Sequence, residues 1–474
     1  MATLLSTLQL SCFALVAFVA VIVLRASFRQ PKGNVPPGPK PLPIIGNFFD
    51  LPSAGQAEFQ HWLKHKDAYG PVSSISVMGT TLIIFHDKDV AHAYNEKYRK
   101  HRKMVHQEIG TKGLSAGFHP IQEKESLHFI LETFQQPDAI LHHLKTLAAA
   151  IVLNVTYGYN IDRSQPDPLV ELIDHAMENL SKAFVPLYWA VGHLPNWFPG
   201  MSYRKTAQKW KAINEAAAQL PYDFVKRQMA RRAHSASYVS NLLESSMAKS
   251  ASGEVSLAAE DEEAIKWTAV SLYAAGSDST VAIIHSVLCA LVIFPEVVKR
   301  AQEEIDRVVG TNRLPSLTST ASSRKRGDGI PYLIPKGSYL LPSLWWFLND
   351  PNEYPEPRIF KPERYMEPLN NPDPSELAFG YGRRSCAGRF FADASVYIAV
   401  VQLLAAFDVR KAKYSQGRGI PVTLEAIPGM VNRPAPFEFK VEPRSQRQID
   451  LLHRILSEQK PEVSHASLLR LSEV

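Results

Sequence analysis

The deciding stretch of this 474-residue chain is Phe379-Gly380-Tyr381-Gly382-Arg383-Arg384-Ser385-Cys386-Ala387-Gly388, which has the pattern F-x-x-G-x-R-x-C-x-G. It stands directly before an apolar stretch, 389–406, that predicts a helix. Loop amides and the dipole of that helix both favour a negatively charged sulfur. We therefore expect Cys386 to be a thiolate that ligates a metal.

A thiolate of this kind suits oxygen activation at a haem iron, because its sulfur donates electron density that favours O–O cleavage. Phe379 would shield the sulfur, and Arg384 would neutralise a haem propionate. The glycines at Gly382 and Gly388 would let the backbone pass close under the ring. The alternative is a buried structural cysteine in a glycine-rich turn, which explains neither the arginine nor the flanking residues.

The ten-residue pattern resembles the haem-ligand loop of the cytochrome P450 family, and every signature position is filled. The resemblance implies a mainly α fold with small β-sheets, a cytochrome P450-like haem-thiolate fold behind a single N-terminal transmembrane helix. It also implies haem (iron protoporphyrin IX) as the cofactor, with Cys386 as the axial metal ligand.

A second motif, Ala275-Gly276-Ser277-Asp278-Ser279-Thr280, lies in an apolar run, 265–293, that predicts a helix. Acid and alcohol side chains compete with a helix for hydrogen bonds, and glycine costs about 1 kcal/mol relative to alanine, so we expect a locally opened turn. The alternative is a tolerated polar patch on a surface helix. The resemblance implies that Asp278 and Ser279, with Thr280 behind them, deliver protons to dioxygen at the haem. Ser279 stands where the family usually has threonine.

Two shorter matches extend the resemblance. In Tyr98-Arg99-Lys100-His101-Arg102, the family often has W-x-x-x-R, which implies that Arg102 pairs with a propionate. The alternative is that 97–103 is simply a basic helical face. The segment Pro362-Glu363-Arg364-Tyr365 is similar to the P-E-R-F segment of the family, where the arginine joins an E-x-x-R helix in a buried ionic triad.

That E-x-x-R helix is missing from its expected place. Glu304-Ile305-Asp306-Arg307 belongs to the preceding helix of the family, so we reject it as the partner of Arg364. Family segments are absent near 88–98 and 318–330, which is the pattern expected from skipped exons, from misassigned exon boundaries or from divergence. Loss of both partners predicts that Arg364 is an unpaired buried charge, and such losses cost about 3–5 kcal/mol.

The predicted organisation has four parts. Residues 4–24 carry no charge and are long enough to span a bilayer, and the basic residues that follow place the remainder in the cytosol. A basic and Pro-rich hinge occupies 25–43, a haem-thiolate catalytic domain 44–445, and a polar C-terminal tail 446–474. We expect a single-pass protein of the endoplasmic reticulum membrane.

Several elements follow from local patterns. Apolar runs at 72–78 and 80–85 predict a hairpin joined at Gly79, and Pro295 and Gly310 predict the ends of a helix over 295–309. The Ser-, Ala- and Glu-rich segment 235–263 is interpreted as a surface connection between long helices. Short strands are expected around 332–341.

Composition is compatible with the function that the resemblance to the cytochrome P450 family implies, a monooxygenase of hydrophobic substrates, but does not by itself indicate it. Three cysteines cannot form a disulfide framework, and a net charge of +6 fits an anionic membrane surface or an acidic protein partner. We predict a monooxygenase that oxidises a hydrophobic fungal secondary metabolite (a terpenoid, polyketide or aromatic) with O2 and an NADPH-dependent flavoprotein reductase. Its partners would include membrane lipid but no nucleic acid. The alternatives are a non-catalytic or misfolded haem-binding membrane protein, and a haem-thiolate isomerase or dehydratase.

Overall fold

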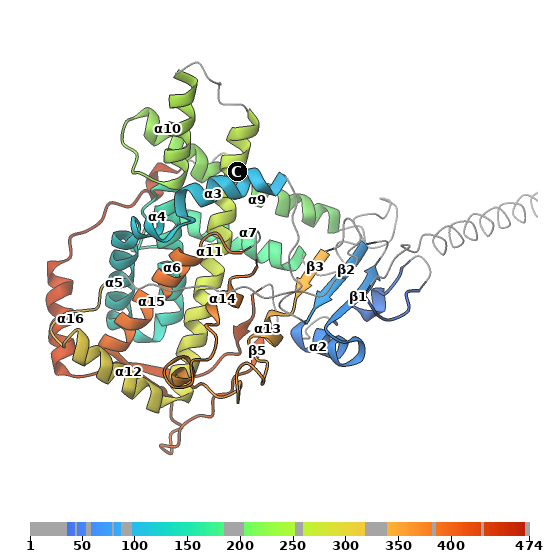
Figure 1. Cartoon of the computed structure of the whole chain (residues 1–474). Coiled ribbons are helices and arrows are strands. Elements are labelled where there is room, and N and C mark those ends of the chain that lie inside the picture. Colours follow the sequence, from blue (N-terminus) through green and yellow to red (C-terminus); the bar gives the residue numbers. More distant parts are fainter. Residues whose placement is uncertain are drawn as a thin grey trace, which may run out of the picture. The chain divides into compact units, whose positions relative to one another are not determined.

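The computed structural model describes ten ranges of the chain: 36–42, 45–53, 58–77, 80–86, 97–183, 203–251, 259–317, 339–381, 385–427 and 431–469. The chain divides into two compact units (Figure 1). Unit 1 comprises Met1–Tyr94 and Ala321–Ser385, and unit 2 comprises Asn95–Thr320 and Cys386–Val474. The described residues are mainly helical with small sheets, as predicted. The predicted transmembrane helix at 4–24 lies outside the described residues.

Unit 1 is built on a three-stranded sheet. Its predicted hairpin is confirmed, because β1 (Val72–Val77) and β2 (Thr80–Phe85) pair antiparallel and Val77 lies opposite Thr80. Strand β3 (Tyr339–Pro342) joins β2 in parallel and accounts for the described end of the strand region expected at 332–341. Helix α2 (Glu58–Tyr69) covers the sheet through Trp62, which packs with three buried side chains of β1 and β2.

The Pro-rich segment at 36–42 is extended, as its composition requires, and it follows the edge strand β1. Ser74 donates from its amide to the Pro37 carbonyl (2.8 Å) and from its hydroxyl to the Pro36 carbonyl (2.6 Å). A side chain at Gly38 would collide with the Ser74 carbonyl, so glycine is required for this close approach. The remaining described elements of unit 1 are short: η1 (Phe48–Asp50), α13 (Leu344–Phe347), η4 (Pro362–Tyr365) and α14 (Ser375–Ala378).

Unit 2 contains the long helices. They are α3 (Lys97–Ile109), α4 (Lys112–Ala116), α5 (His119–Gln135), α6 (Ile140–Tyr157), α7 (Pro168–Ala183), α9 (Tyr203–Ala230), α10 (Tyr238–Ala251), α11 (Ala259–Ile293), α12 (Pro295–Val308), α15 (Arg389–Ala406) and α16 (Gln446–Glu458), with the 3-10 turns η3 (Pro137–Ala139) and η6 (Ala466–Leu468). The predicted ends of α12 are confirmed, with Pro295 in its first turn and Gly310 left-handed (φ +79°) just beyond it.

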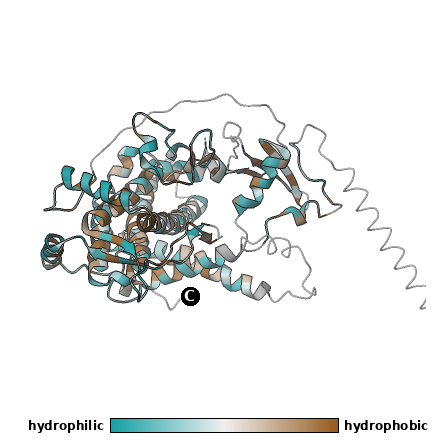
Figure 2. Cartoon of the chain, turned by 90° about the horizontal axis from the view of Figure 1, so that it is seen from below, coloured by the Kyte–Doolittle hydropathy of each residue, from teal (hydrophilic) through white to brown (hydrophobic). Residues whose placement is uncertain are grey.

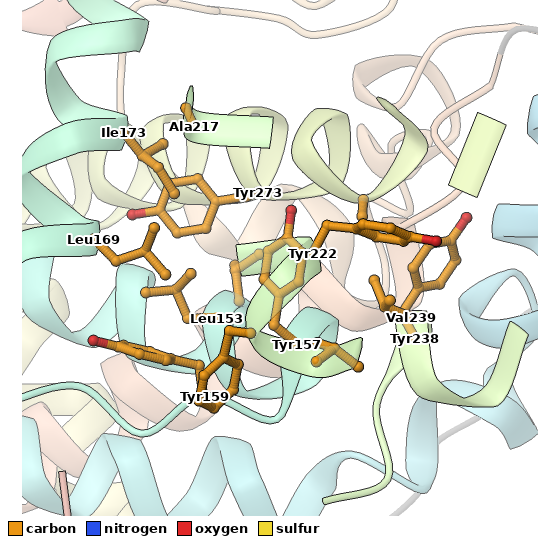
Figure 3. Close-up of a cluster of buried hydrophobic side chains, with 14 of the residues drawn as sticks. Leu153, Tyr157, Tyr159, Leu169, Ile173, Ala217, Tyr222, Tyr238, Val239 and Tyr273 are labelled. Carbon is orange, nitrogen blue, oxygen red and sulfur yellow. The ribbon is translucent and has the colours of Figure 1, made fainter. Parts of the chain in front are cut away.

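Helix α10 corrects the interpretation of 235–263 as a surface connection. Tyr238, Val239 and Leu243 on its first turns are fully buried in the core that α6, α9 and α11 share. Figure 3 shows Tyr238 and Val239 in this cluster beside Tyr157 and Tyr222. The polar composition of the segment concealed one buried face, because a short helix needs only a few apolar positions per two turns.

A second core of unit 2 gathers α5, α6, α11, α12 and α15 around Phe129, Leu144, Leu288 and Leu403. The chain then forms two small antiparallel sheets, β4 (Phe407–Lys411) with β7 (Phe439–Pro443), and β5 (Ala426–Ile427) with β6 (Arg433–Pro434). In the predicted C-terminal tail, α16 buries Leu452 in this core, and the His465 amide donates to the Asn160 carbonyl (2.9 Å).

Three described helices are long and apolar enough to cross a membrane, judged by length and composition only: Pro137–Tyr157, Ala259–Ile293 and Arg389–Ala406. All three contribute buried residues to the cores of unit 2. Figure 2 shows apolar and polar residues alternating along the outer helices, as expected for helices with one buried face. Core packing therefore accounts for much of the apolar character of these three helices.

Candidate active site

Cys386 is an exposed free thiol at the start of α15. Two residues later, Gly388 is the N-cap residue of α15 and its carbonyl accepts a bond from the Ala392 amide (2.8 Å). The other described cysteine, Cys289, is buried in α11, and burial raises the pKa of its thiol. Of the two described cysteines, Cys386 is therefore the accessible one, and the prediction that it ligates the iron stays a prediction.

Helix α11 is continuous through the second motif, which corrects the prediction of an opened turn. Ser279 donates its hydroxyl to the Ala275 carbonyl one turn earlier (2.6 Å), so the alcohol bonds to the helix and leaves the turn closed. Gly276 serves packing, because a β-carbon there would lie 3.0 Å from the Val152 side chain on α6. The prediction that Gly276 helps to open the helix turn was therefore wrong. Glycine at this position instead allows α11 and α6 to approach closely.

One face of α11 is open. Ser271, Ala275 and Ser279 follow one another at four-residue spacing, so they lie within about 80° of one another around the helix, and none of the three is buried. Ser279 lies at the C-terminal end of this face.

Asp278 is turned away from the centre of that face and forms an ion pair with Arg433 on β6. The next residue on a helix lies about 100° further round, so Asp278 stands at the border of the open face. Thr280, on the other side of Ser279, is buried. The structure thus separates the acid, the exposed alcohol and the buried alcohol that the sequence presents as one motif.

A cavity of about 460 Å³ lies on the Asp278 side of α11. Its wall is strongly charged and includes Lys145 of α6, Asp174 and Glu178 of α7, Asp278 of α11 and Arg433 of β6. Partial desolvation in this enclosure raises the pKa of Asp174, against the opposing charges of Lys145 and Arg433. Motif analysis missed Asp174 and Arg433, since no local pattern marks residues that meet only through tertiary contacts.

The other predicted site residues are distributed as follows. Arg102 is half-buried on α3, a helix that packs on α11 and α4. Ile109, at the end of α3, lies 3.8 Å from the β-carbon position of Gly388, so α3 ends beside the start of α15. Phe379 is half-buried in unit 1 at the C-cap of α14. Gly382 and Arg384 lie outside the described residues.

These features fit a haem. A porphyrin brings four of its own ligands to the iron, so the protein needs to supply one exposed thiolate and an apolar surface rather than a multi-residue metal cluster. Within the described ranges, no group of three or more His, Cys, Asp or Glu side chains could hold a metal ion. The Cys386 thiol, the open face of α11 and the basic helix α3 all belong to unit 2.

Comparison with known proteins identifies the family to which the chain belongs. The model of the family described as Cytochrome P450 matches residues 83–324 and 326–441. The chain therefore belongs to the cytochrome P450 family of haem-thiolate enzymes, and it is a monooxygenase.

Its relatives are fungal. It is similar to the multifunctional cytochrome P450 monooxygenase af510 of Aspergillus fumigatus, with 68% identity over 99% of both chains. It is 37% identical to the cytochrome P450 monooxygenase CLM2 of Gibberella zeae, over 96% of this chain and 98% of that protein. The O-methylsterigmatocystin oxidoreductase of Aspergillus flavus is 31% identical over 90% of this chain and 91% of its own length.

The alignments also bear on the missing segments. The match to the Aspergillus fumigatus protein runs over 533 positions although this chain has 474 residues, so 59 or more positions are gaps in this chain. The family match is interrupted at residue 325, within the segment where the E-x-x-R helix is missing. Both observations agree with internal segments that relatives have and this chain lacks.

Arg364 has hydrogen-bond partners, but its acceptors among the described residues are carbonyls, so the prediction that its charge lacks a carboxylate partner stays a prediction. The buried guanidinium donates to the carbonyls of Pro355 (2.8 Å), Ile359 (2.9 Å), Glu356 (3.1 Å) and Lys361 (3.2 Å). Glu304 and Arg307 bond to each other on the exposed surface of α12 (3.1 Å), consistent with rejecting them as the triad partners. In the described part of unit 1, Arg364 is therefore satisfied by its own loop.

Proposed function

We propose that this monooxygenase oxidises a hydrophobic small molecule of fungal secondary metabolism, a terpenoid, polyketide or aromatic, with O2 and electrons from an NADPH-dependent flavoprotein reductase. The observation that carries the proposal is the exposed Cys386 thiol just before α15, in the same unit as the open face of α11. The names of its relatives, one of which is an O-methylsterigmatocystin oxidoreductase, support a small organic substrate.

The residues of this chain would divide the work. Cys386 ligates the iron, while Arg102 and Arg384 neutralise the propionates. Phe379 shields the sulfur, and Gly382 and Gly388 admit the ring edge. The haem supplies, when bound, the oxidising chemistry that no side chain has. Asp278 and Ser279, with Thr280 behind them, hold and move the protons.

Location and partners follow from charge and hydropathy. The uncharged segment 4–24 would anchor the protein in the endoplasmic reticulum membrane with the catalytic part in the cytosol. The net charge of +6 would favour both an anionic membrane surface and an acidic reductase.

The test of the site is spectroscopic. Reduced, carbon-monoxide-bound protein should show the red-shifted Soret band of thiolate ligation, and Cys386→Ala should abolish it because the sulfur donor is gone. The matched control is Cys289→Ala, which removes a buried thiol from α11 and should leave the band in place. A band that survives Cys386→Ala would sink the assignment.

A further inference from the structure

The chain after α16 crosses unit 2 from one core to the other. Leu452 of α16 is buried in the core of α5, α12 and α15, and Leu469 is buried in the core that α6, α9, α10 and α11 share. Residues 459–469 join these two anchor points, and we call them the C-terminal strap. The family match ends at residue 441, so the strap lies outside the part of the chain that matches the family model.

The C-terminal strap is attached to different helices near its two ends. Near its start, a carboxylate oxygen of Glu462 lies 3.0 Å from the Lys124 ammonium and 3.5 Å from a ring nitrogen of His128, both on α5. Near its end, Arg227 of α9 donates to the Leu468 carbonyl (3.4 Å). The strap therefore connects α5 with α9, two helices that belong to different cores.

His465 lies in the middle of the strap and bonds twice to Asn160, in the loop after α6. Its amide donates to the Asn160 carbonyl (2.9 Å), and its Nδ1 accepts from the Asn160 amide (3.0 Å). Its ring packs against Tyr159 (5.9 Å between ring centroids) and against Phe224 of α9 (5.3 Å). The Asn160 side chain accepts in turn from Asn154 on α6 (2.7 Å). A single histidine thus links the strap to α6 and to α9.

The bond at Nδ1 requires a neutral imidazole. A backbone N–H can only donate, so Nδ1 of His465 must keep its lone pair, whereas a protonated ring carries hydrogen on both nitrogens. Protonation would therefore break the bond from the Asn160 amide and place a charge in a half-buried site. In agreement with this geometry, burial lowers the pKa of His465 from its ordinary value of 6.5.

The charged groups around the strap are engaged elsewhere. Asp167 accepts from the Tyr159 hydroxyl (2.9 Å), and Arg227 donates to a strap carbonyl. Although burial opposes it, the hydrogen bonds and charges of the two α5 partners hold the pKa of Glu462 below its ordinary value. Glu462 therefore stays ionised while the pH falls through the range in which His465 would take up a proton.

We propose that the C-terminal strap is an acid-released latch on α9. With His465 neutral, the strap holds the C-terminal half of α9 to the loop after α6. With His465 protonated, residues 463–469 leave this site while the helices of unit 2 stay folded. The strap can open alone because its regular structure is the short 3-10 turn η6, and every residue of it except Leu469 is exposed or half-buried. This role concerns conformation and does not rest on the proposed function.

Amide hydrogen exchange of the full-length, haem-loaded protein tests the latch. Below pH 6.5 and above the lowered pKa of the closed strap, the open strap binds a proton that the closed strap refuses. The open fraction should therefore rise by up to about tenfold for each unit that the pH falls in this window. Exchange in residues 463–469 and in the last turns of α9 should rise together, after correction for the intrinsic effect of pH on exchange. Exchange in the middle of α15 should stay constant.

Two variants and a control assign the effect. His465→Phe keeps an aromatic ring but cannot take up a proton, and it removes the acceptor of the Asn160 amide. It should raise strap exchange at every pH and abolish its pH dependence. A chain that ends at Glu458 should show, at neutral pH, the α9 exchange that the parent shows in acid. The matched control is His453→Phe, the same change at an exposed histidine of α16, which should keep the pH dependence of the parent.

The outcomes separate the parts of the proposal. Strap exchange that is independent of pH in the parent, or equally pH-dependent in His465→Phe, would overturn the role of His465. Opening of the strap without any change in α9 would overturn the latch. A parent protein without the thiolate Soret band would instead overturn the proposed function, and hydrogen exchange would still judge the latch.

Discussion

Two arginines, the half-buried Arg163 of unit 2 and the buried Arg364 of unit 1, find their hydrogen-bond acceptors in different ways. In unit 2, Arg163 pairs with Glu125, whose side chain is 4% exposed, and with Glu132 (2.5 Å). In unit 1, Arg364 is 5% exposed, and its described acceptors are four carbonyls. Carbonyls meet the hydrogen-bonding demand of a guanidinium without neutralising its charge. In unit 1, the carbonyl acceptors therefore remove the hydrogen-bonding part of the cost of lacking a carboxylate partner. The electrostatic cost of the uncompensated Arg364 charge remains.

The largest expected effect concerns the carboxylate pair. Arg163→Met should lower the free energy of unfolding by about 3 kcal/mol, because it leaves the Glu125 carboxylate buried with weaker support. This value is the lower end of the range of about 3–5 kcal/mol for breaking a buried ion pair. The lower end is expected because Lys124 also approaches Glu125 (3.3 Å). Chemical unfolding of the purified protein measures the change, with Arg410→Met as the control for loss of an exposed arginine.

Arg364→Met should cost less, about 2 kcal/mol, although it removes more hydrogen bonds. Carbonyls left without a donor lower the free energy of unfolding by about 1–3 kcal/mol in total. Removal of the uncompensated buried charge raises it and offsets part of that loss. The measurement is the same unfolding experiment. If Arg364→Met lowered the free energy of unfolding more than Arg163→Met, the carboxylate pair of Arg163 would not be the more stabilising of the two arrangements.

A chimera sharpens this second prediction. The chimera carries an E-x-x-R helix of the family inserted at residue 325, where the family match is interrupted. In that background Arg364→Met should cost about 3–5 kcal/mol, because a carboxylate would then lose its partner. An unchanged cost would mean that the inserted segment does not reach Arg364.

Acidification should lower the stability of the protein through a buried histidine of unit 1, His86. His86 is 4% exposed, and burial, aided by the charges of His65 and Lys66, lowers its pKa to about 4. Between pH 6.5 and about 4 the unfolded chain binds a proton that the folded chain refuses, so stability falls as pH falls through this window. His86→Phe should reduce that loss by about 1 kcal/mol at a pH of about 5.5. The two proteins compared at a pH of about 8 provide the control, since no proton is then taken up on unfolding.

The smallest effect belongs to the surface pair on α12. Arg307→Ala should leave the Tm unchanged within error, because water screens an exposed pair and already solvates both groups. A clear drop in Tm would mean that Glu304 and Arg307 support more than each other.

Much of the fold could be predicted from local patterns. The hairpin of β1 and β2, the helix that starts at Pro295, and the long apolar helix around Asp278 all depend on residues close in sequence. Helix α10 escaped prediction because its few buried positions stand among serines and glutamates. The opened turn of α11 was wrong because the Ser279 hydroxyl bonds one turn back and Gly276 packs on Val152, and neither outcome can be read from the motif alone.

The sequence by itself carries the prediction of the metal ligand, since that prediction depends only on ten consecutive residues and the helix that follows them. It also determined the family, through motifs of the same local kind. Only the tertiary structure decided which groups meet the charges: Asp278 finds Arg433 on a distant hairpin, and Arg364 finds four carbonyls of its own loop. The physical reason is that buried charge must be compensated by whatever the fold brings within hydrogen-bond distance, and that depends on packing rather than on neighbours in sequence.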